Sequence, residues 1–579
     1  MTGRRLTFLQ ACAELGFRVE DMHAVGDNSS SASDGENEEI FENDENSYDD
    51  EDREEQSVVD DEGDISIYEE SSENDDSEEN EFENENILAN GIHYTMQPLA
   101  VRRRRRNILT QCPRTLANPV NEKEAFHLFM QEDILRTILR YTNMKARQVR
   151  RSLRRPDNYS LPFSMKELLA GLAIIVRAGS DRDNFTELEN LWSEEDGKPF
   201  YRACMAIRRF KYLIRCLRFD NSNTREVRKE ENKFAAVSEI WELFLSSLRR
   251  YLQCDENITI DEQLVGYRGR IPGRTYMPSK PRKYGLKIFW ACESSSGYAL
   301  NGLIYGGRNP NEGVHRNLAY DVVTQLSQPF FGTGRNICTD NYFTSHGLAV
   351  TLLENNLTLL GTIRRQRKEV PDILRQRMQC YNSQFVFDHE NQIMLVSYQA
   401  KRNKQVMLLS SSHTSPDVCR DETKKPTLIF DYNQLKGGVD MFDENLEEFT
   451  SRRKTNRWTL LFFYNLIDVA CNNAHILLRK NGYCESKKQF LKKLSLSLAK
   501  PYVEARVRHP KIRKTVRVAA VQVKFICLDT TVSSVVNAEC SVRRCFSCGK
   551  MTRSTCDKCR RHICPAHRLL KKTSMCFDC

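Results

Sequence analysis

The sequence predicts a multi-domain α/β protein with a mixed β-sheet core, a helical domain and a small cysteine-rich module. Three observations predict this class. Apolar residues recur at helical spacing from about residue 120 to 255, and near residue 257 the period changes to the alternation of strands. The segment 540–579 is rich in cysteine. At roughly 150 residues per domain, the 579 residues allow three or four folded units.

Charge is divided unevenly along the chain. There are 86 Lys+Arg against 79 Asp+Glu, a net charge of +7. Residues 31–86 hold 27 acidic residues and one basic residue, Arg53, so the rest of the chain has 85 basic and 52 acidic side chains, or +33. A basic body of this size favours a polyanion as partner, most often nucleic acid. The polar segment 26–86 is predicted to be disordered, because it has too few apolar side chains to offset the entropy of ordering.

Two classes of protein are disfavoured. No continuous apolar run of about 18 residues is present, so no membrane span is expected. The nearest candidate, Trp458–Leu478, is interrupted by asparagines, an aspartate and a histidine and is predicted to be a buried helix. The N-terminus lacks a secretion signal, so we expect the 20 cysteines to be thiols or metal ligands in a reducing compartment.

Five consecutive arginines, Arg102–Arg106, follow the acidic segment. They predict a nuclear import signal or an arm that contacts DNA, and hence a nuclear protein. The alternative is a solvated basic stretch that balances the acidic segment.

Helices are predicted first and a sheet afterwards. Ser164 and Glu167 form a capping box before an apolar helix, and Phe200–Leu217 has the pattern of one basic helix. Three consecutive strands are then predicted, followed by a helix (Leu318–Leu326), a strand, a second helix (Gly347–Leu353) and a fifth strand. The strands are Ile258–Val265, Ile288–Cys292, Tyr298–Tyr305, Asn336–Thr339 and Leu357–Ile363. This is the element order of an RNase H-like domain. A β-rich insertion with strands 385–387, 393–399 and 405–410 precedes one further helix, Gly438–Phe449.

Four aspartates occupy special places on this predicted scaffold. Asp261 lies on the first strand, Asp340 ends the fourth, and Asp440 and Asp443 share one face of the last helix. Clustered carboxylates repel unless a cation neutralises them, and Mg²⁺ prefers oxygen ligands. A carboxylate triad with two metal ions suits phosphoryl transfer. Singly, each aspartate is more often a turn or capping residue, and Asp443 is alternatively a solvated helix charge.

Basic residues surround these points and suit a nucleic-acid channel, especially where tyrosines are interleaved. The alternative is a solvated basic loop. The candidates in the first stretch are Arg268, Arg270, Arg274, Lys280, Arg282, Lys283 and Lys287. Those in the second are Arg452, Arg453, Lys454, Arg457 and Trp458. Trp458 either stacks on a base or anchors the buried helix in the core.

The C-terminal segment contains four pairs of metal-ligand residues with two residues between the partners. They are Cys545 and Cys548, Cys556 and Cys559, Cys564 and His567, and Cys576 and Cys579. Eight such ligands predict two tetrahedral Zn²⁺ sites. By analogy with cross-brace modules, the first and third pairs share one zinc and the other two pairs share the second. The net positive charge of the segment favours DNA binding, with ubiquitin ligation and histone-tail recognition as alternatives.

Together these motifs resemble the piggyBac transposase family. The resemblance runs from about residue 120 to the C-terminus and includes the zinc module. The matching stretches are Ile260–Arg270, Pro278–Lys287, Cys338–Ser345, Tyr432–Asp440 and Ser451–Trp458. It implies that Asp261, Asp340 and Asp440 are catalytic carboxylates that bind Mg²⁺ or Mn²⁺, and that Asp443 is a further catalytic residue.

The resemblance also implies an activity and an assembly. We expect a homodimeric cut-and-paste DNA transposase that binds terminal inverted repeats of double-stranded DNA, excises through a hairpin intermediate and integrates at TTAA sites. No small-molecule substrate or membrane partner is expected. The alternative is a domesticated DNA- or chromatin-binding protein without transposition activity.

The resemblance and the composition together divide the chain into eight segments. Helical segments 110–256 and 450–528 form a dimerisation and DNA-binding domain, and segments 257–366 and 427–449 form the RNase H-like domain. The others are a disordered acidic region with the arginine run (1–109), the insertion (367–426), a linker (529–539) and the zinc module (540–579).

Overall fold

The computed structural model describes residues 87–99, 113–278, 280–307, 317–525, 543–552, 554 and 561–567. All of them belong to the second of the chain's two units, Val59–Cys579. The acidic segment 31–86, the arginine run Arg102–Arg106, the linker 529–539 and four of the eight predicted zinc ligands lie outside the described residues.

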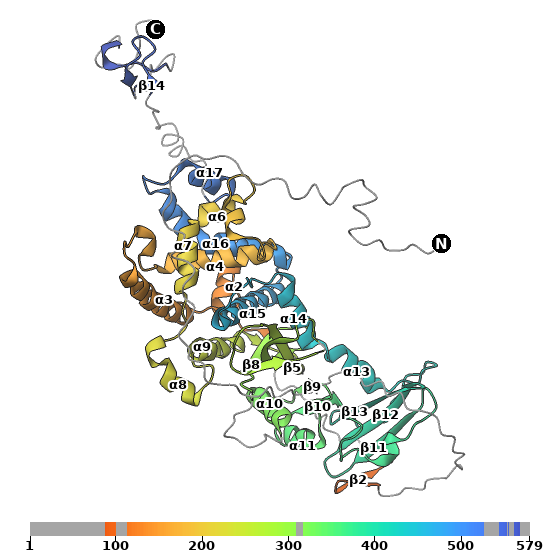
Figure 1. Ribbon diagram of the computed structural model, residues 1–579. Coiled ribbons are helices and arrows are strands. Elements are labelled where there is room, and N and C mark those ends of the chain that lie inside the picture. Colours follow the sequence, from red (N-terminus) through yellow and green to blue (C-terminus); the bar gives the residue numbers. More distant parts are fainter. Residues whose placement is uncertain are drawn as a thin grey trace, which may run out of the picture. The chain divides into compact units, whose positions relative to one another are not determined.

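The five strands of the predicted core are present, and they form one mixed sheet (Figure 1). Their order across the sheet is β8, β7, β5, β9, β10, with β5, β7 and β8 antiparallel and β5, β9 and β10 parallel. Helices α10 (Leu318–Ser327) and α11 (His346–Glu354) connect the later strands. The strands are β5 (Asn257–Gly266), β7 (Tyr284–Glu293), β8 (Ala299–Ile304), β9 (Asn336–Thr339) and β10 (Thr358–Thr362).

The strands predicted as an insertion continue this same sheet. They are β11 (Ser383–Asp388), β12 (Ile393–Lys401) and β13 (Lys404–Ser410), and β13 pairs antiparallel with β10. Two smaller additions were not expected from the sequence. Strand β6 (Arg274–Tyr276) pairs with the start of β7, and the hairpin of β1 (Ile87–Ala89) and β2 (Ile92–Thr95) pairs with β11.

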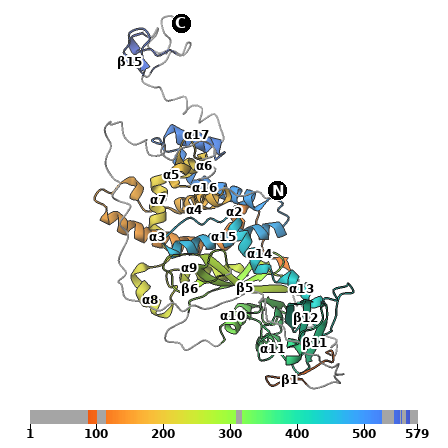
Figure 2. The same ribbon diagram turned by 45° about the vertical axis from the view of Figure 1, so that its right-hand side comes forward.

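This hairpin corrects the prediction that residues 1–109 are disordered throughout. Tyr94 is fully buried, and its hydroxyl donates to the Glu369 carbonyl at 3.0 Å. Unlike the acidic segment before it, residues 87–99 contain enough apolar side chains to contribute to a core. The hairpin extends the sheet beyond β11, with β2 next to β11 and β1 at the outer edge (Figure 2).

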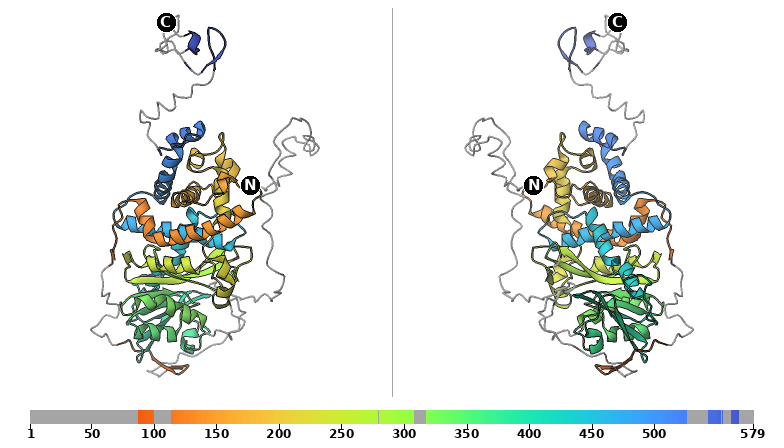
Figure 3. Two further views of the ribbon diagram at one scale, coloured as in Figure 1. Left: turned by 90° about the vertical axis from the view of Figure 1, so that its left-hand side faces the viewer. Right: turned by 90° about the vertical axis from the view of Figure 1, so that its right-hand side faces the viewer.

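Helices that precede the sheet in the sequence pack against helices that follow it, and together they form a helical body. Helix α16 packs against α4, and α15 packs against α2 (Figure 3). The helices before the sheet are α2 (Glu122–Phe129), α3 (Glu132–Ser152), α4 (Met165–Ser180), α5 (Leu188–Trp192), α6 (Pro199–Cys204), α7 (Ile207–Cys216), α8 (Arg225–Glu231) and α9 (Ser238–Leu248). Helix α12 (Asp372–Arg375) lies between β10 and β11, and the helices after the sheet are α13 (Thr427–Leu435), α14 (Gly438–Glu448), α15 (Trp458–Lys480), α16 (Lys487–Val507) and α17 (Lys514–Gln522).

Local signals explain where several helices begin and end. The predicted capping box is present, because the Ser164 side chain accepts from Glu167 N and the Glu167 side chain accepts from Ser164 N. The single helix predicted over 200–217 is instead two helices, α6 and α7. Met205 is extended between them, and its carbonyl accepts a 2.7 Å bond from Trp192 Nε1. This hydrogen bond stabilises the interruption between the two helices, which helical periodicity alone does not reveal.

Helix α15 joins the helical body to the sheet. Among the described helices it is long and apolar enough to cross a bilayer, but 89% of its apolar window is buried inside the protein, as in a core helix. Two asparagines of α15 form hydrogen bonds with backbone N–H and C=O groups of the sheet region. Asn473 accepts from Ala299 N at 3.0 Å and donates to Ala299 O at 2.9 Å, and Asn472 donates to Gly297 O at 3.2 Å.

Two short ladders lie outside the large sheet. Strands β3 (Arg114–Thr115) and β4 (Leu252–Gln253) pair beside the helical body, and β14 (Arg543–Arg544) and β15 (Met551–Thr552) pair in the cysteine-rich module.

Candidate active site and metal centre

Asp261 and Asp340 lie side by side on the sheet. Strands β5 and β9 are parallel neighbours, and Ile260 pairs with Thr339. Asp261 is the next residue of β5, and Asp340 directly follows the end of β9, so their side chains start from adjacent positions. This is the convergence that the sequence analysis predicted for the first and fourth strands.

The electrostatics of this pair match clustered carboxylates. Burial, followed by the charges of Glu262 and Asp340, raises the pKa of Asp261 well above its ordinary value. Burial and the charge of Glu262 raise the pKa of Asp340 to about 6. Burial is the largest cause of both shifts and the neighbouring carboxylates add to it, so both carboxyls are harder to ionise than an exposed aspartate. Glu262 was missed by the sequence analysis, although its position next to Asp261 was a usable signal.

Helix α14 brings the other two aspartates to the sheet. Thr259 Oγ1 donates to the Leu435 carbonyl at 2.6 Å, just before the helix begins. A Cβ atom at Gly438 would lie 2.6 Å from that same hydroxyl oxygen, so the close approach of helix and strand requires glycine there. Asp440 is exposed on the first turn of α14, and Asp443 is half-buried one turn further along.

Asp443 is tied to the strand that holds Asp261. Gln263 Nε2 donates to Asp443 Oδ1 at 2.8 Å. Burial raises the pKa of Asp443, while this hydrogen bond acts in the opposite direction. The buried Cys292 thiol on β7 is within the electric field of both Asp261 and Asp443, and burial together with these two charges raises its pKa. The structure therefore places Asp261, Asp340 and Asp443 in one region, with Asp440 coupled to it through Asp443.

The chemistry of this donor set fits a hard divalent cation. The donors are carboxylate oxygens, and Glu262 and Asp340 add negative charge beside the buried Asp261 carboxyl, which a cation would offset. The carboxylates are nevertheless spread more widely than a closed ligand cage. Among the described residues, ligand atoms of three or more His, Cys, Asp or Glu residues gather within 4.8 Å only in the cysteine-rich module.

An exposed basic surface lies beside the carboxylates, on the β5–β7 connection. It is formed by the exposed Arg268, Arg270, Arg274, Arg282 and Lys283, with the half-buried Lys280. Tyr276 and Tyr284 pack with their ring centroids 4.8 Å apart, and the Arg274 guanidinium lies 5.5 Å from the Tyr284 centroid. Arg282 also lies 3.5 Å from a Glu447 carboxylate oxygen.

Lys287 differs from the other predicted DNA contacts of this stretch. Its side chain is buried on β7, and Nζ lies 4.9 Å from the Phe289 ring centroid and 5.3 Å from that of Tyr342. All residues of β7 from Gly285 to Glu293 are buried, so Lys287 is not part of the exposed basic surface.

The second basic stretch, residues 451–458, is mostly engaged with the protein itself. Arg453 donates to the carbonyls of Asp183 and Thr186 at 3.0 and 2.5 Å, and Arg457 donates to Ile214 O at 2.8 Å. Arg452 pairs with Glu447 at 3.0 Å. Of the four basic residues predicted to bind DNA in this stretch, Lys454 is the exposed one.

Trp458 anchors the start of α15. Its ring is partly buried against the main core and meets Phe234 edge to face, with 6.0 Å between centroids. Of the two roles considered from the sequence, core anchoring is the one that these contacts favour.

Four residues of the cysteine-rich module form a compact metal-ligand cluster. The ligand atoms of Cys545, Cys548, Cys564 and His567 all lie within 4.8 Å of one another. A hydrogen bond with His567 is the main cause that lowers the pKa of the Cys564 thiol, which favours the thiolate that binds metal. The four residues are the set that the cross-brace analogy assigns to one zinc. The other predicted set, Cys556, Cys559, Cys576 and Cys579, lies outside the described residues.

Comparisons with known proteins agree with this architecture. A family model described as Transposase IS4 matches residues 121–475. The human PiggyBac transposable element-derived protein 2 is 22% identical over 370 residues, which cover 60% of this chain and 60% of that protein. The human PiggyBac transposable element-derived protein 3 is 23% identical over 368 residues and 59% of each chain. The matches thus span less than two thirds of these curated relatives.

A solved structure is similar over more of the chain. It is the cryo-EM structure of a piggyBac transposase synaptic complex with hairpin DNA, with a TM-score of 0.70 and 31% identity. The similarity covers 81% of this chain and 99% of the solved one. Fold and family model together define an IS4-like transposase. The chain belongs to the piggyBac-type transposase family.

Proposed function

We propose that the protein is a cut-and-paste DNA transposase that cleaves and joins DNA strands by metal-dependent phosphoryl transfer. The adjacency of Asp261 and Asp340 on parallel strands, with Asp440 and Asp443 delivered by α14, is the observation that supports this most strongly. The strand order β8, β7, β5, β9, β10 is the order expected of an RNase H-like core.

The roles of the residues follow from their positions. Asp261, Asp340 and Asp440 would hold Mg²⁺ or Mn²⁺, which when bound activates the attacking oxygen and stabilises the leaving one. Asp443 supports this site from the next turn of α14. The exposed arginines and lysines of the β5–β7 connection bind backbone phosphates and place the scissile bond near the carboxylates.

The substrate follows from the family. We propose that the protein acts in the nucleus as a homodimer on double-stranded DNA and binds terminal inverted repeats. It excises through a hairpin intermediate and integrates at TTAA. The solved relative is a synaptic complex with hairpin DNA, which supports this assignment. The two zinc ions of the C-terminal module would complete a DNA-binding surface.

A second candidate function has its own support. The curated human relatives are described as transposable element-derived proteins, which favours a domesticated DNA- or chromatin-binding role without transposition. The aspartates at all four candidate catalytic positions support the first function instead.

An excision assay distinguishes the two. A plasmid that carries the DNA flanking the protein's own coding sequence, including both element ends and TTAA, is introduced into cells with the protein. Repair to an uninterrupted TTAA is expected for a transposase. Binding to the ends without excision would favour the domesticated role.

A further inference from the structure

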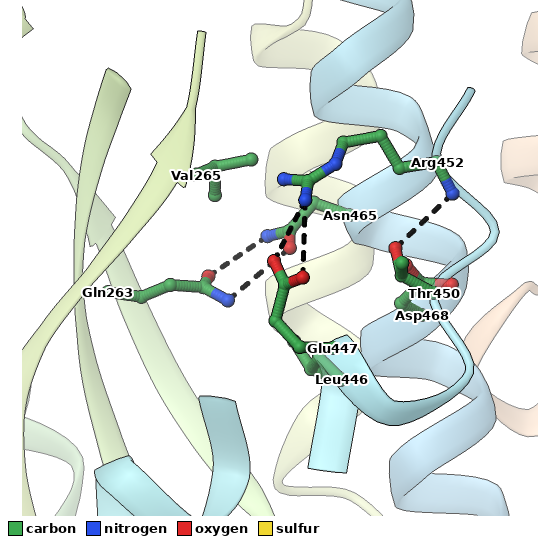
Figure 4. Close-up of a pocket in the computed structure, with 8 residues that line it drawn as sticks. All are labelled: Gln263, Val265, Leu446, Glu447, Thr450, Arg452, Asn465 and Asp468. Atoms are coloured by element: carbon green, nitrogen blue, oxygen red, sulfur yellow. Dashed lines mark hydrogen bonds and ion pairs between the residues drawn. The ribbon is translucent and has the colours of Figure 1, made fainter. Parts of the chain in front are cut away.

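Gln263 is a buried side-chain amide next to the catalytic carboxylates. It lies on β5, two residues after Asp261, and is 3% exposed. Besides its bond to Asp443, its Oε1 accepts from Trp290 Nε1 at 3.0 Å and from Asn465 Nδ2 at 3.1 Å. Figure 4 shows the Gln263 and Asn465 side chains facing each other at the polar pocket between β5 and α15.

These contacts determine which way the amide faces. An indole nitrogen can only donate, so the Gln263 atom that faces Trp290 must be the oxygen. The amide nitrogen must then point away from Trp290, and it donates to Asp443 Oδ1 at 2.8 Å and, more weakly, to Asn465 Oδ1 at 3.4 Å. Rotation of the amide by half a turn would place N–H against N–H at Trp290. The donor directed at Asp443 is therefore held in place by a second strand, β7, and by the helical body through Asn465.

We propose that Gln263 is a positioning residue that orients the Asp443 carboxylate for catalysis. This inference rests on the proposed phosphoryl-transfer function. Asp443 is on helix α14, and the first turn of α14 packs against the sheet. The hydrogen bond from Gln263 fixes the second turn of α14 to β5, the strand that holds Asp261. The Trp290–Gln263–Asp443 chain thereby sets the spacing between two carboxylates that come from distant parts of the sequence.

The test uses the full-length protein and two variants at this position. Gln263→Met keeps the length of the side chain but removes both the donor and the acceptor. Gln263→Glu keeps the acceptors for Trp290 and Asn465 but replaces the donor with a carboxylate oxygen that faces Asp443. The matched control is Gln399→Met. Gln399 is another buried sheet glutamine, on β12, and it donates to the carbonyls of Lys401 and Arg402. Each protein is assayed for DNA affinity, melting temperature, single-turnover cleavage of an element-end duplex, and the Mg²⁺ concentration for half-maximal cleavage.

We expect cleavage by both Gln263 variants to fall by about 10- to 100-fold, the usual cost of losing a group that orients a metal-site carboxylate. The Mg²⁺ requirement should rise, while DNA affinity stays within about twofold of the unmodified protein. The control should lose melting temperature but not cleavage rate. A solely structural role would lower the melting temperature of the Gln263 variants without changing the Mg²⁺ requirement.

The experiment distinguishes failure of the positioning role from failure of the proposed function. Cleavage by Gln263→Met within twofold of the unmodified protein, at an unchanged Mg²⁺ requirement, would overturn the positioning role alone. If Gln263→Met does not fold, the same criterion applies to Gln263→Glu, which retains both acceptor contacts. Absence of cleavage by the unmodified protein would overturn the proposed function and the positioning role with it.

Discussion

His346 and Asp388 form a buried pair, with 2.8 Å between His346 Nε2 and Asp388 Oδ2. His346 begins α11 in the core of the sheet domain, and Asp388 ends β11, the strand that also pairs with the N-terminal hairpin. Burial acts to raise the pKa of Asp388, but hydrogen bonds from His346 and Asn391 outweigh it and hold that pKa below its ordinary value. The pair therefore attaches the outer strands to the core.

This pair predicts a pH dependence of stability. Because the folded-state pKa of Asp388 is below the unfolded value of about 3.9, the ionised carboxylate stabilises the fold above that pH. The contribution is lost as the pH falls through the folded-state pKa. Asp388→Asn should lower the melting temperature at pH 7, and the difference from the unmodified protein should shrink below about pH 4. Thermal unfolding between pH 7 and 3 measures this. Asp372→Asn, whose side chain is 91% exposed, is the control. A difference that does not change with pH would contradict the assignment.

A second prediction concerns the attachment of α15 to β8. Asn473→Leu removes the partner of both the N–H and the C=O of Ala299, which are buried. We expect the free energy of unfolding to fall by about 1–3 kcal/mol for these unpaired groups. Urea denaturation measures it, with the exposed Asn433→Leu on α13 as control. Equal unfolding midpoints for the two variants would show that the Asn473 bonds are not important for stability.

The catalytic assignment predicts a separation of binding from chemistry. Asp340→Asn should abolish strand cleavage while end binding remains largely intact, because the change removes a metal-ligand charge without altering the basic surface. Gel-shift and cleavage assays on one duplex measure both properties. Asp321→Asn, at an exposed position on α10, should behave like the unmodified protein. Residual excision by Asp340→Asn would show that the carboxylate assignment is wrong.

Two arginines that the sequence analysis grouped together should behave differently. Arg270→Gln should weaken DNA binding about equally for all sequences and reduce the slope of log affinity against log salt by about 1, as for one phosphate contact. Arg457→Gln should instead destabilise the fold, because its guanidinium caps buried carbonyls and burial lowers its pKa. Salt titrations and thermal unfolding of both variants test the contrast. Loss of the salt slope in Arg457→Gln with an unchanged melting temperature would reverse the two roles.

The cysteine-rich module predicts a metal content. The eight ligands should bind two zinc ions, and Cys564→Ser should leave one, because it breaks the cluster with Cys545, Cys548 and His567. Elemental analysis of the purified proteins counts the metal. Cys380→Ser, at an exposed cysteine on the sheet domain, should leave the content unchanged. Equal zinc in the Cys564 variant and the unmodified protein would exclude this cluster as a site.

The parts predicted well from the sequence are those with local signals. Asn336–Thr339 is a strand with those same bounds, and the Ser164–Glu167 capping box begins a helix, because alternation and capping are properties of short segments. The candidate carboxylates could be named because strand ends and a helical face are visible in the sequence. Gln263 was not named, because its importance depends on Trp290 and Asn465, which are remote in the chain.

What the sequence alone determined is the set of chemical groups: four aspartates, the basic stretches and the paired cysteines and histidine. Tertiary structure decided which of them act together. It placed residues 383–410 in the same sheet as Asp261, turned Lys287 and Arg457 inward while leaving Arg270 exposed, and directed the Gln263 amide at Asp443. The physical reason is that exposure and hydrogen-bond partners depend on segments far apart in the chain, whereas charge and periodicity are local.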